Sequence, residues 1–430
     1  MKSKRALLLV LTLTVLSLVS VSTVFATTYY VKNGGNDSLS GTSDANAWAH
    51  APGMYGWTGS ATISPGDTVL FNRGDTWTFS GSSNGTSYAI PTSGTAAAPI
   101  YYGAYGTGNR PVFNGNGIQE WYGMISLTGI SYVTIDNWEL TNGQDQLMQV
   151  WGPNSTGVIV QNSVFHDNTQ PGYQLVEVEG MAVGGVTQIT FNNNLFYNGQ
   201  HDGLKFNDGV TYATVSNNVF HDIQHNSFDT LSMKTPGYVC SNFTVYGNDI
   251  YAGINSGGAD GMYIPGLVNS VIYGNTIHDF AGVGIQSDAQ VFPTQNVTIR
   301  NNVLWNLSGT GNYALWFTGG NSGINIWNNT IYNCNSPDID DGGESFANNL
   351  AYDSTKVNVN SIKDLGSNPM FVNPTGTPPD FHLQAGSPAI DAGVNVGLPY
   401  SGSAPDLGAF EYTGTTAQPP AAPSGLRILS

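Results

Sequence analysis

The chain has 430 residues, of which only 10% are charged, and its formal net charge is −17. An acidic chain with so few bases is a poor partner for phosphates, so we expect it to bind neither nucleic acid nor an anionic membrane surface. Its 54 glycines and many asparagines favour turns and stacked strands over helices.

Residues 1–26 have the three parts of a secretory signal peptide: a basic start, an almost unbroken apolar run, and the small residues of Val24-Phe25-Ala26. We expect cleavage after Ala26 and a secreted protein, either extracellular or at the cell surface. Removing this segment changes the formal charge from −17 to −20. An uncleaved membrane anchor is the alternative, because the apolar run is nearly long enough to span a bilayer.

From about residue 130 the sequence repeats one phrase, as in "IDNWELTN", "VSNNVFHD", "IYGNTIHD" and "IWNNTIYN". A large apolar residue marks each repeat: Leu140, Phe165, Phe196, Phe220, Ile250, Ile277, Leu304 and Ile331. The steps between markers run from 24 to 31 residues. This period, with short alternating strands and no helical stretch, predicts a solenoid whose units are stable only when they stack.

A column of asparagine precedes the marker, where the chain must turn a corner. It contains Asn162, Asn193, Asn217, Asn301, Asn328 and Asn348, with Gly247 and Gly274 in two repeats. Asparagine and glycine both tolerate left-handed backbone angles, and asparagine amides can bond from coil to coil. We interpret the column as structural.

An aromatic column follows the marker: His166, Tyr197, His221, Tyr251, His278, Trp305 and Tyr332. It resembles a sugar-stacking strip, but we interpret it as an aromatic stack that lines a corner. Because its histidines alternate freely with Tyr and Trp, we do not expect it to bind a metal.

Two cysteines in a secreted chain suggest a disulfide. However, Cys240 and Cys334 fall about three repeats apart, and at roughly 4.8 Å per coil their backbones are too distant to bridge. We therefore expect two buried free thiols.

The repeats and both ends resemble the right-handed parallel β-helix, or pectate-lyase-like, superfamily of extracellular carbohydrate-active proteins. The opening "TTYYVKNGGNDSLSGTSDANAW" is similar to the N-terminal start of such proteins, and "SNPMFVNPTGTPPDFHLQAGSPAIDAG" to "PDLGAFEY" is similar to their closing segment. The resemblance covers Thr28 to Tyr412. It implies an all-β fold, a right-handed parallel β-helix solenoid of roughly 10–12 coils with N- and C-terminal caps. That fold hosts lyases, hydrolases, epimerases and non-catalytic surface proteins.

We expect a single β-helix domain at residues 27–412, with an N-terminal cap region at 27–60 and a closing segment at 365–412. Residues 413–430 are Pro-rich and predict a linker or tail, in which "APSGLRI" faintly resembles the first strand of a fibronectin type III domain. We expect a monomer.

A second strand follows each marker by about eight to ten residues, and its apolar residue should point into the core. The next residue of each strand then points outward, which gives the column Gln149, Glu177, Lys205, Asp229, Tyr263, Gln286 and Trp316. Two positions before the inward residue, a neighbouring column contains Asp202, Asn226 and Asp260, with Glu179 and Asp208 near its far end. The acids should therefore gather within about 15 Å on one face.

Within this patch, "HDGLKF" resembles the Asn-Thr-Asp-Gly strand of polygalacturonases, which would carry a catalytic role to Asp202. The acid pair that those enzymes have on the next coil falls at Asn226 and Ser227, so the match ends there.

Our preferred hypothesis is an enzyme, a glycoside hydrolase that binds an extracellular polysaccharide. Hydrolysis needs two carboxyls, about 5 Å apart for retention or about 6.5–9.5 Å apart for inversion. Glu177 with Asp229, or Asp202 with Asp260, suits inversion, and Glu177 with Asp202 suits retention. Crowding should raise the pKa of the general acid. Substrate would contact Trp151, Glu179, Asn226, Tyr263, Gln286 and Trp316, and no cofactor is required.

The alternative is a polysaccharide lyase that performs Ca²⁺-assisted β-elimination on a polyuronate, with Lys205 as the base and Ca²⁺ at Glu177, Glu179, Asp202 and Asp229. Lys234 and Arg300 are other candidate bases. Neighbouring acids would raise the pKa of Lys205, which hinders its use as a base unless Ca²⁺ absorbs their charge. The scarcity of bases favours a neutral or weakly charged glycan.

A third hypothesis is a non-catalytic surface or matrix protein. Glu177, Lys205 and Asp229 would then form a charge ladder on an exposed sheet, in which each pair contributes under about 1 kcal/mol.

Overall fold

The computed structural model describes residues 26–181, 184–230, 238–253, 259–288, 292–307, 313–318, 320–334, 339–340, 345–352 and 368–414. The expected signal peptide, most of the expected C-terminal linker and Lys234 lie outside the described residues. Within those residues, no helix has the length and apolar character needed to cross a membrane.

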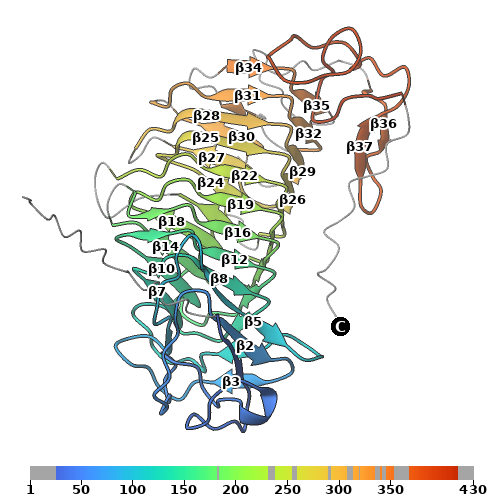
Figure 1. The fold of residues 1–430 in the computed structure, drawn as a ribbon. Helices are drawn as coiled ribbons and strands as arrows, with labels where there is room; N and C mark the ends of the chain where they lie inside the picture. Colours follow the sequence, from blue (N-terminus) through green and yellow to red (C-terminus); the bar gives the residue numbers. More distant parts are fainter. Residues whose placement is uncertain are drawn as a thin grey trace, which may run out of the picture.

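Three long parallel sheets wind around one axis and build a solenoid (Figure 1). Sheet A has twelve strands: β1 (Thr28–Val31), β2 (Thr68–Asn72), β5 (Ile100–Tyr105), β8 (Val133–Asp136), β12 (Ile159–Gln161), β16 (Thr190–Asn192), β19 (Thr214–Ser216), β22 (Thr244–Tyr246), β25 (Val268–Tyr273), β28 (Gln295–Arg300), β31 (Asn325–Trp327) and β34 (Ser345–Ala347). Sheet B has ten: β4 (Tyr88–Ala89), β7 (Ile125–Thr128), β10 (Met148–Trp151), β14 (Val176–Glu179), β18 (Leu204–Asn207), β21 (Phe228–Asp229), β24 (Met262–Tyr263), β27 (Ile285–Ser287), β30 (Leu315–Phe317) and β33 (Ile339–Asp340).

Sheet C has eleven: β3 (Thr76–Thr78), β6 (Val112–Asn114), β9 (Glu139–Thr141), β13 (Val164–His166), β17 (Leu195–Tyr197), β20 (Val219–His221), β23 (Asp249–Tyr251), β26 (Thr276–Phe280), β29 (Val303–Leu307), β32 (Thr330–Tyr332) and β35 (Leu350–Tyr352). Outside these sheets lie a short 3₁₀ helix, η1 (Asp44–Asn46), the parallel pair β11 (Ser155–Thr156) and β15 (Val186–Thr187), and the antiparallel pair β36 (Phe371–Asn373) and β37 (Asp380–Leu383). The expected all-β solenoid is confirmed, and its three sheets contain 10 to 12 strands each.

Alternate residues of each strand fill the interior of the solenoid. In β18, Leu204 and Phe206 are fully buried in the core, while Lys205 between them points away from it. The same alternation recurs in the other sheets, and the inward residues form a continuous hydrophobic core from Val31 to Ala351. Burial of these side chains, which no single coil achieves alone, stabilises the stack.

The expected corner column of asparagine and glycine is confirmed. Its eight members have φ between 51° and 65°: Asn162, Asn193, Asn217, Gly247, Gly274, Asn301, Asn328 and Asn348. A second asparagine follows at most of these corners, points into the core, and had no assigned role in the sequence pattern.

These second residues form a buried asparagine ladder: Asn194, Asn218, Asn248, Asn275, Asn302, Asn329 and Asn349. The Nδ2 of each donates to the Oδ1 of the next at 2.9–3.0 Å. The backbone N–H of each donates to that same oxygen. The ladder therefore joins seven successive corners through hydrogen bonds shielded from water.

The aromatic column is also confirmed as a corner stack. Rings from His166 to Trp305 lie nearly parallel, with centroids 4.3–5.2 Å apart. Both cysteines, Cys240 and Cys334, are buried and not joined to each other, as expected. At the C-terminal end, residues 371–410 pack against the last coils in a small cluster of their own around Leu350.

We predict that Asn248→Ala destabilises the fold by about 2–4 kcal/mol, because it removes the Oδ1 that accepts the backbone N–H and the amide of Asn218, and the Nδ2 that donates to the carbonyl of Val215. Chemical denaturation measures this change in the free energy of unfolding. Asn325→Ala is the matched control, since the side chain of the half-exposed Asn325 makes, among the described residues, only a long 3.5 Å contact with Thr298. An equal effect of both variants would contradict a special role for the ladder.

Candidate functional site

The outward column expected on sheet B forms in the expected register. Strand pairing places Gln149 beside Glu177, and then Lys205, Asp229, Tyr263, Gln286 and Trp316 in succession. The inward residues before them, from Met148 to Leu315, are buried in the core. The repeat pattern of the sequence therefore predicted correctly which residues are neighbours in this outward column.

The acids of this face are not exposed, contrary to the charge-ladder expectation. Glu177, Asp202 and Asp229 are all buried. Glu177 is buried because amide side chains surround it: Gln146 and Gln149 donate to Oε2, and Asn207 donates to Oε1 at 2.6 Å. Buried, hydrogen-bonded carboxylates interact more strongly than exposed ion pairs do.

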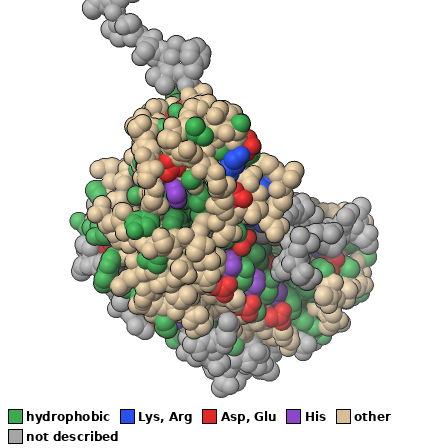
Figure 2. Space-filling model, turned by 90° about the horizontal axis from the view of Figure 1, so that it is seen from below, with side chains coloured by type: hydrophobic (Ala, Val, Ile, Leu, Met, Phe, Trp, Pro, Cys, Tyr) green, Lys and Arg blue, Asp and Glu red, His purple; other side chains and the backbone are tan. Residues whose placement is uncertain are grey.

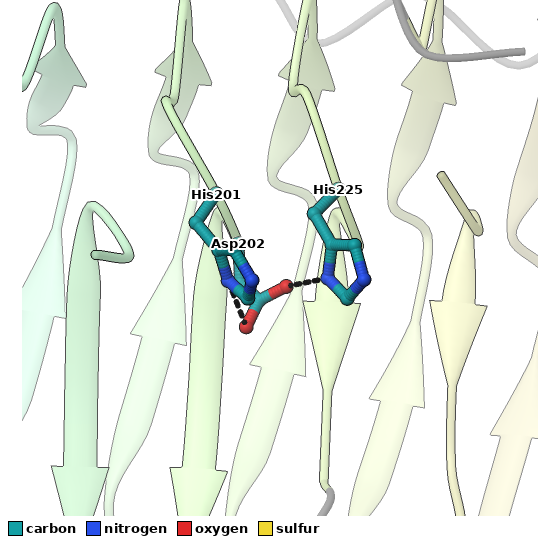
Figure 3. Close-up of side chains that lie close together, drawn as sticks. All are labelled: His201, Asp202 and His225. Atoms are coloured by element: carbon teal, nitrogen blue, oxygen red, sulfur yellow. Dashed lines mark hydrogen bonds and ion pairs between the residues drawn. The ribbon is translucent and has the colours of Figure 1, made fainter. Parts of the chain in front are cut away.

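The polar residues around this face form one cluster: Glu177, His201, Asp202, Lys205, His225, Asn226, Asp229 and Asp260. Asp202 lies at its centre, between the two histidines (Figure 3). His225 Nδ1 is 2.7 Å from Asp202 Oδ1, and the backbone N–H of Asn226 donates to the same oxygen. His201 Nδ1 lies 3.0 Å from Oδ2, close enough for an ion pair but without hydrogen-bond geometry. The two imidazole rings stack 4.3 Å apart.

Lys205 carries the positive charge of the cluster. Its Nζ is 3.2 Å from Asp202 Oδ2 and 3.4 Å from Asp229 Oδ2. Only 13% of its side chain is exposed. Burial alone would lower the pKa of Lys205, but Asp229, Asp202 and Glu177 outweigh it and raise that pKa well above its ordinary value. As expected from the sequence, this ammonium is a poor base.

Asn226 ties three acids together. Besides its bond to Asp202, its Nδ2 donates to Asp229 Oδ2 at 2.9 Å, and its Oδ1 accepts the backbone N–H of Asp260. Asn226, which we expected to contact substrate, thus makes its hydrogen bonds within the cluster. Where polygalacturonases have an acid, this chain has an amide that can both donate and accept.

Asp202 and Asp260 occupy equivalent positions, yet their pKa values move in opposite directions. Burial would raise the pKa of Asp202, but the bond with His225, the close contact with His201 and the charge of Lys205 hold it well below its usual range. The expectation that crowding raises the pKa of the general acid therefore does not hold for Asp202. Asp260 has the backbone N–H of Val283 rather than a cation as its close partner, and burial raises its pKa to about 7.

Histidines 201 and 225 are the functional candidates that the sequence pattern missed. A signal was present, because each directly precedes a member of the column that contains Asp202 and Asn226. Their side chains are 31% and 39% exposed, the most accessible in the cluster. Burial would lower the pKa of His225, but its bond to Asp202 and the nearby acids raise it above its ordinary value.

Other histidine–aspartate pairs differ from this one. Figure 2, which views the molecule from below, shows histidine and acidic side chains gathered in a row, with few lysines or arginines near them. In the corner stack, a histidine such as His221 contacts the next residue, Asp222, whose carboxylate is largely exposed. Asp202, in contrast, is buried and serves two imidazoles and an ammonium at once.

The remaining sequence candidates lie at the ends of the face or elsewhere. Tyr263 and Gln286 both bond Asp288. Trp316 stacks on Tyr313 at one end, and Trp151 stacks on Tyr122 at the other. Glu179, beside Trp151, and Asp208 are buried. Arg300 belongs to sheet A, where it covers the ring of Tyr273, so it is not a base for this site.

The cluster does not suit Ca²⁺, although one donor atom each from His201, Asp202 and His225 lies within 4.8 Å of the others. Ca²⁺ takes six to eight oxygen ligands. Here both oxygens of Asp202 already face N–H donors, and Lys205 Nζ occupies the space between Asp202 and Asp229. Within the expected calcium set, Asp202 and Asp229 are thus already paired with Lys205, and Glu177 already accepts hydrogen bonds from three amides.

Comparisons with known proteins agree on the fold. The family model described as "Right handed beta helix region" matches residues 78–222 and 179–362. Pectate lyase L of Dickeya dadantii (strain 3937) is 26% identical, over 89% of this chain and 90% of its own. The crystal structure of pectate lyase Pel9A superposes with a TM-score of 0.52 at 21% identity, covering 89% of this chain and 96% of that one.

We predict that Asp202→Asn lowers the pKa of His225, because the substitution removes the anion that stabilises the imidazolium. Histidine NMR titrations measure this change. The titration of His278 is the internal control, since its partners are Asp249 and Asp279 in the corner stack. An unchanged pKa for His225 would show that Asp202 is not its main partner. The substitution should also destabilise the protein by about 3–5 kcal/mol, as breaking a buried ion pair does.

Proposed function

Because this chain belongs to the right-handed β-helix family, we propose that it is a polysaccharide-cleaving enzyme whose substrate lies along the outer face of sheet B. The family match, together with the 26% identity to a pectate lyase over nearly the whole of both chains, supports a glycan substrate. We also propose that residues 1–26 direct secretion, since polysaccharides are met outside the cell.

We propose β-elimination on a uronate-containing glycan, with His225 as the base. One observation carries this choice: the buried carboxylate of Asp202 holds Nδ1 of His225, so that Nε2 points away from Asp202 (Figure 3). A carboxylate in this position fixes the tautomer and orientation of an imidazole. The carboxylates themselves are buried and bonded, whereas the imidazoles reach solvent.

The reaction then proceeds as follows. Nε2 of His225 removes the proton from C5 of the uronate, the electron pair forms a C4=C5 double bond, and the C4–O bond breaks. The leaving oxygen takes a proton from water. Lys205, which shares Asp202 with His225, supplies positive charge to the carboxylate that activates C5. Because that charge comes from the protein, we propose that the reaction needs no bound calcium.

A second candidate function is hydrolysis, the hypothesis preferred from the sequence. Asp260, with a pKa of about 7, has the protonation that a general acid needs. Asp229, which contacts Lys205 Nζ and accepts from Asn226 Nδ2, would be its partner. Two carboxyls in environments that favour the protonated form of one and the anion of the other are typical of glycosidases.

One assay separates the candidates. The purified protein is incubated with polygalacturonate, alginate and neutral glycans, with and without EDTA. We expect the ultraviolet absorbance of an unsaturated uronate product, unaffected by EDTA. Reducing ends without this absorbance would instead favour hydrolysis. Binding without any product would favour the non-catalytic alternative.

We predict that His225→Gln lowers kcat by about 10²–10⁴-fold, the usual contribution of a general base. His221→Gln is the matched control, because His221 makes a similar contact with an aspartate but lies in the corner stack. Asp260→Asn should leave elimination within a fewfold of wild type. Loss of activity in Asp260→Asn but not in His225→Gln would reverse the assignment.

The pH profile follows from the same base. Only neutral imidazole accepts a proton, and the pKa of His225 is raised. We therefore expect kcat/KM to rise with pH through a value above about 6.5, the ordinary pKa of histidine. Steady-state rates between pH 5 and 9 test this, and a rate that falls over that range would contradict a histidine base.

A further inference from the structure

Three aromatic side chains form a platform at the N-terminal end of the sheet B face. Trp121 is 66% exposed and Tyr122 is 41% exposed. The ring of Tyr122 stacks on Trp151 of β10, with centroids 5.2 Å apart and planes at 27°. We call Trp121, Tyr122 and Trp151 the aromatic platform. Exposed aromatic surface of this kind marks an interaction site more often than an isolated apolar residue does.

Two polar atoms beside the platform have no hydrogen-bond partner among the residues that the structure describes. Nε1 of Trp151 and Oε1 of Gln149 are both buried without a hydrogen bond. The two residues are two apart on β10, so both side chains leave the same face of the sheet. Nε1 of Trp151 is a donor, and Oε1 of Gln149 is an acceptor. A buried polar group left unpaired costs about 1–3 kcal/mol, which a bound hydroxyl group would recover.

The platform is held rigidly in place. The backbone N–H of Tyr122 donates to the carbonyl of Gly85 at 3.0 Å, and Ser87 bonds the buried carboxyl of Glu120. Gly85 has a φ of 80°, and a Cβ there would meet Trp121 and Tyr122 at 3.2–3.3 Å. A surface that is already ordered loses little entropy when a ligand binds.

The platform and the His225 site lie on the same sheet. Strand β10 is followed in sheet B by β14, β18 and β21, and His225 lies just before β21. Across the sheet, β10 and β21 are therefore three strand spacings apart, roughly 14–15 Å. A short oligosaccharide along the solenoid axis spans this distance.

We propose that the aromatic platform is a subsite for one pyranose ring of the glycan chain. The apolar C–H face of the ring stacks on Trp121 and Tyr122, and one of its hydroxyls accepts from Trp151 Nε1 and donates to Gln149 Oε1. This assignment rests on the proposed function only in taking the same glycan as ligand. A sugar fits because it presents an apolar face and hydroxyl edges together, as the platform does.

Binding and catalysis test the proposal separately. Affinity electrophoresis in gels that contain the polysaccharide measures Kd, and steady-state rates on the same polysaccharide measure KM and kcat. Trp121→Ala and Tyr122→Ala should each raise Kd and KM by roughly three- to tenfold, with kcat changed less than twofold. Trp151→Phe keeps a ring but removes the N–H, and should give a smaller increase in the same direction.

Tyr212→Ala is the matched control, because Tyr212 is 60% exposed but lies two residues before β19 of sheet A. It should change neither Kd nor KM. Unchanged binding in Trp121→Ala and Tyr122→Ala, equal losses in Tyr212→Ala, or no binding of any polysaccharide would overturn the platform. If binding depends on the platform but no glycan is cleaved, the subsite stands and the proposed reaction fails. If cleavage occurs with KM unchanged in the platform variants, the reaction stands and the subsite fails.

Discussion

The buried asparagine ladder is the constraint on which the rest of the structure depends. The Oδ1 of Asn248 accepts both the backbone N–H and the Nδ2 of Asn218, and its own Nδ2 donates to Asn275 and to the carbonyl of Val215. A shift of one residue between coils would leave such an amide unpaired in the core at every corner. The ladder thus fixes the register of successive coils, while burial of the apolar residues supplies the driving force for stacking.

Fixed register places chemically different residues side by side on sheet B. Glu177, Lys205 and Asp229 are separated by 24 to 28 residues in the chain but are direct neighbours across the strands. The cluster therefore combines groups from several coils: Asp202 takes His201 and Lys205 as partners from its own coil and His225 from the next. No single coil contains the site.

Within the cluster, the pKa of an acid depends more on the groups that it contacts than on its position in the coil. Asp202 and Asp260 occupy equivalent places in their coils and both are buried, yet the pKa of one is lowered and that of the other is raised to about 7. Two imidazoles and an ammonium stabilise the anion of Asp202, whereas a backbone N–H is the close partner of Asp260. This difference changes the chemistry that we infer. Asp202 orients a base, and His225, which remains accessible, is the group suited to react with substrate.

The amino-acid sequence by itself determined the solenoid, the corner asparagines, the stacked aromatic column and the complete sheet B register, because each depends on a residue pattern that recurs with the coil. It also placed Asp202, Lys205 and Asp229 on one face. Only the tertiary structure decided which of these groups are buried, that Lys205 neutralises two acids at once, and that His201 and His225 converge on Asp202. Those outcomes depend on side-chain directions and on contacts between coils, and a linear pattern contains neither. The platform of Trp121, Tyr122 and Trp151 likewise emerged only in three dimensions, since a loop before β7 folds back over a strand from the following coil.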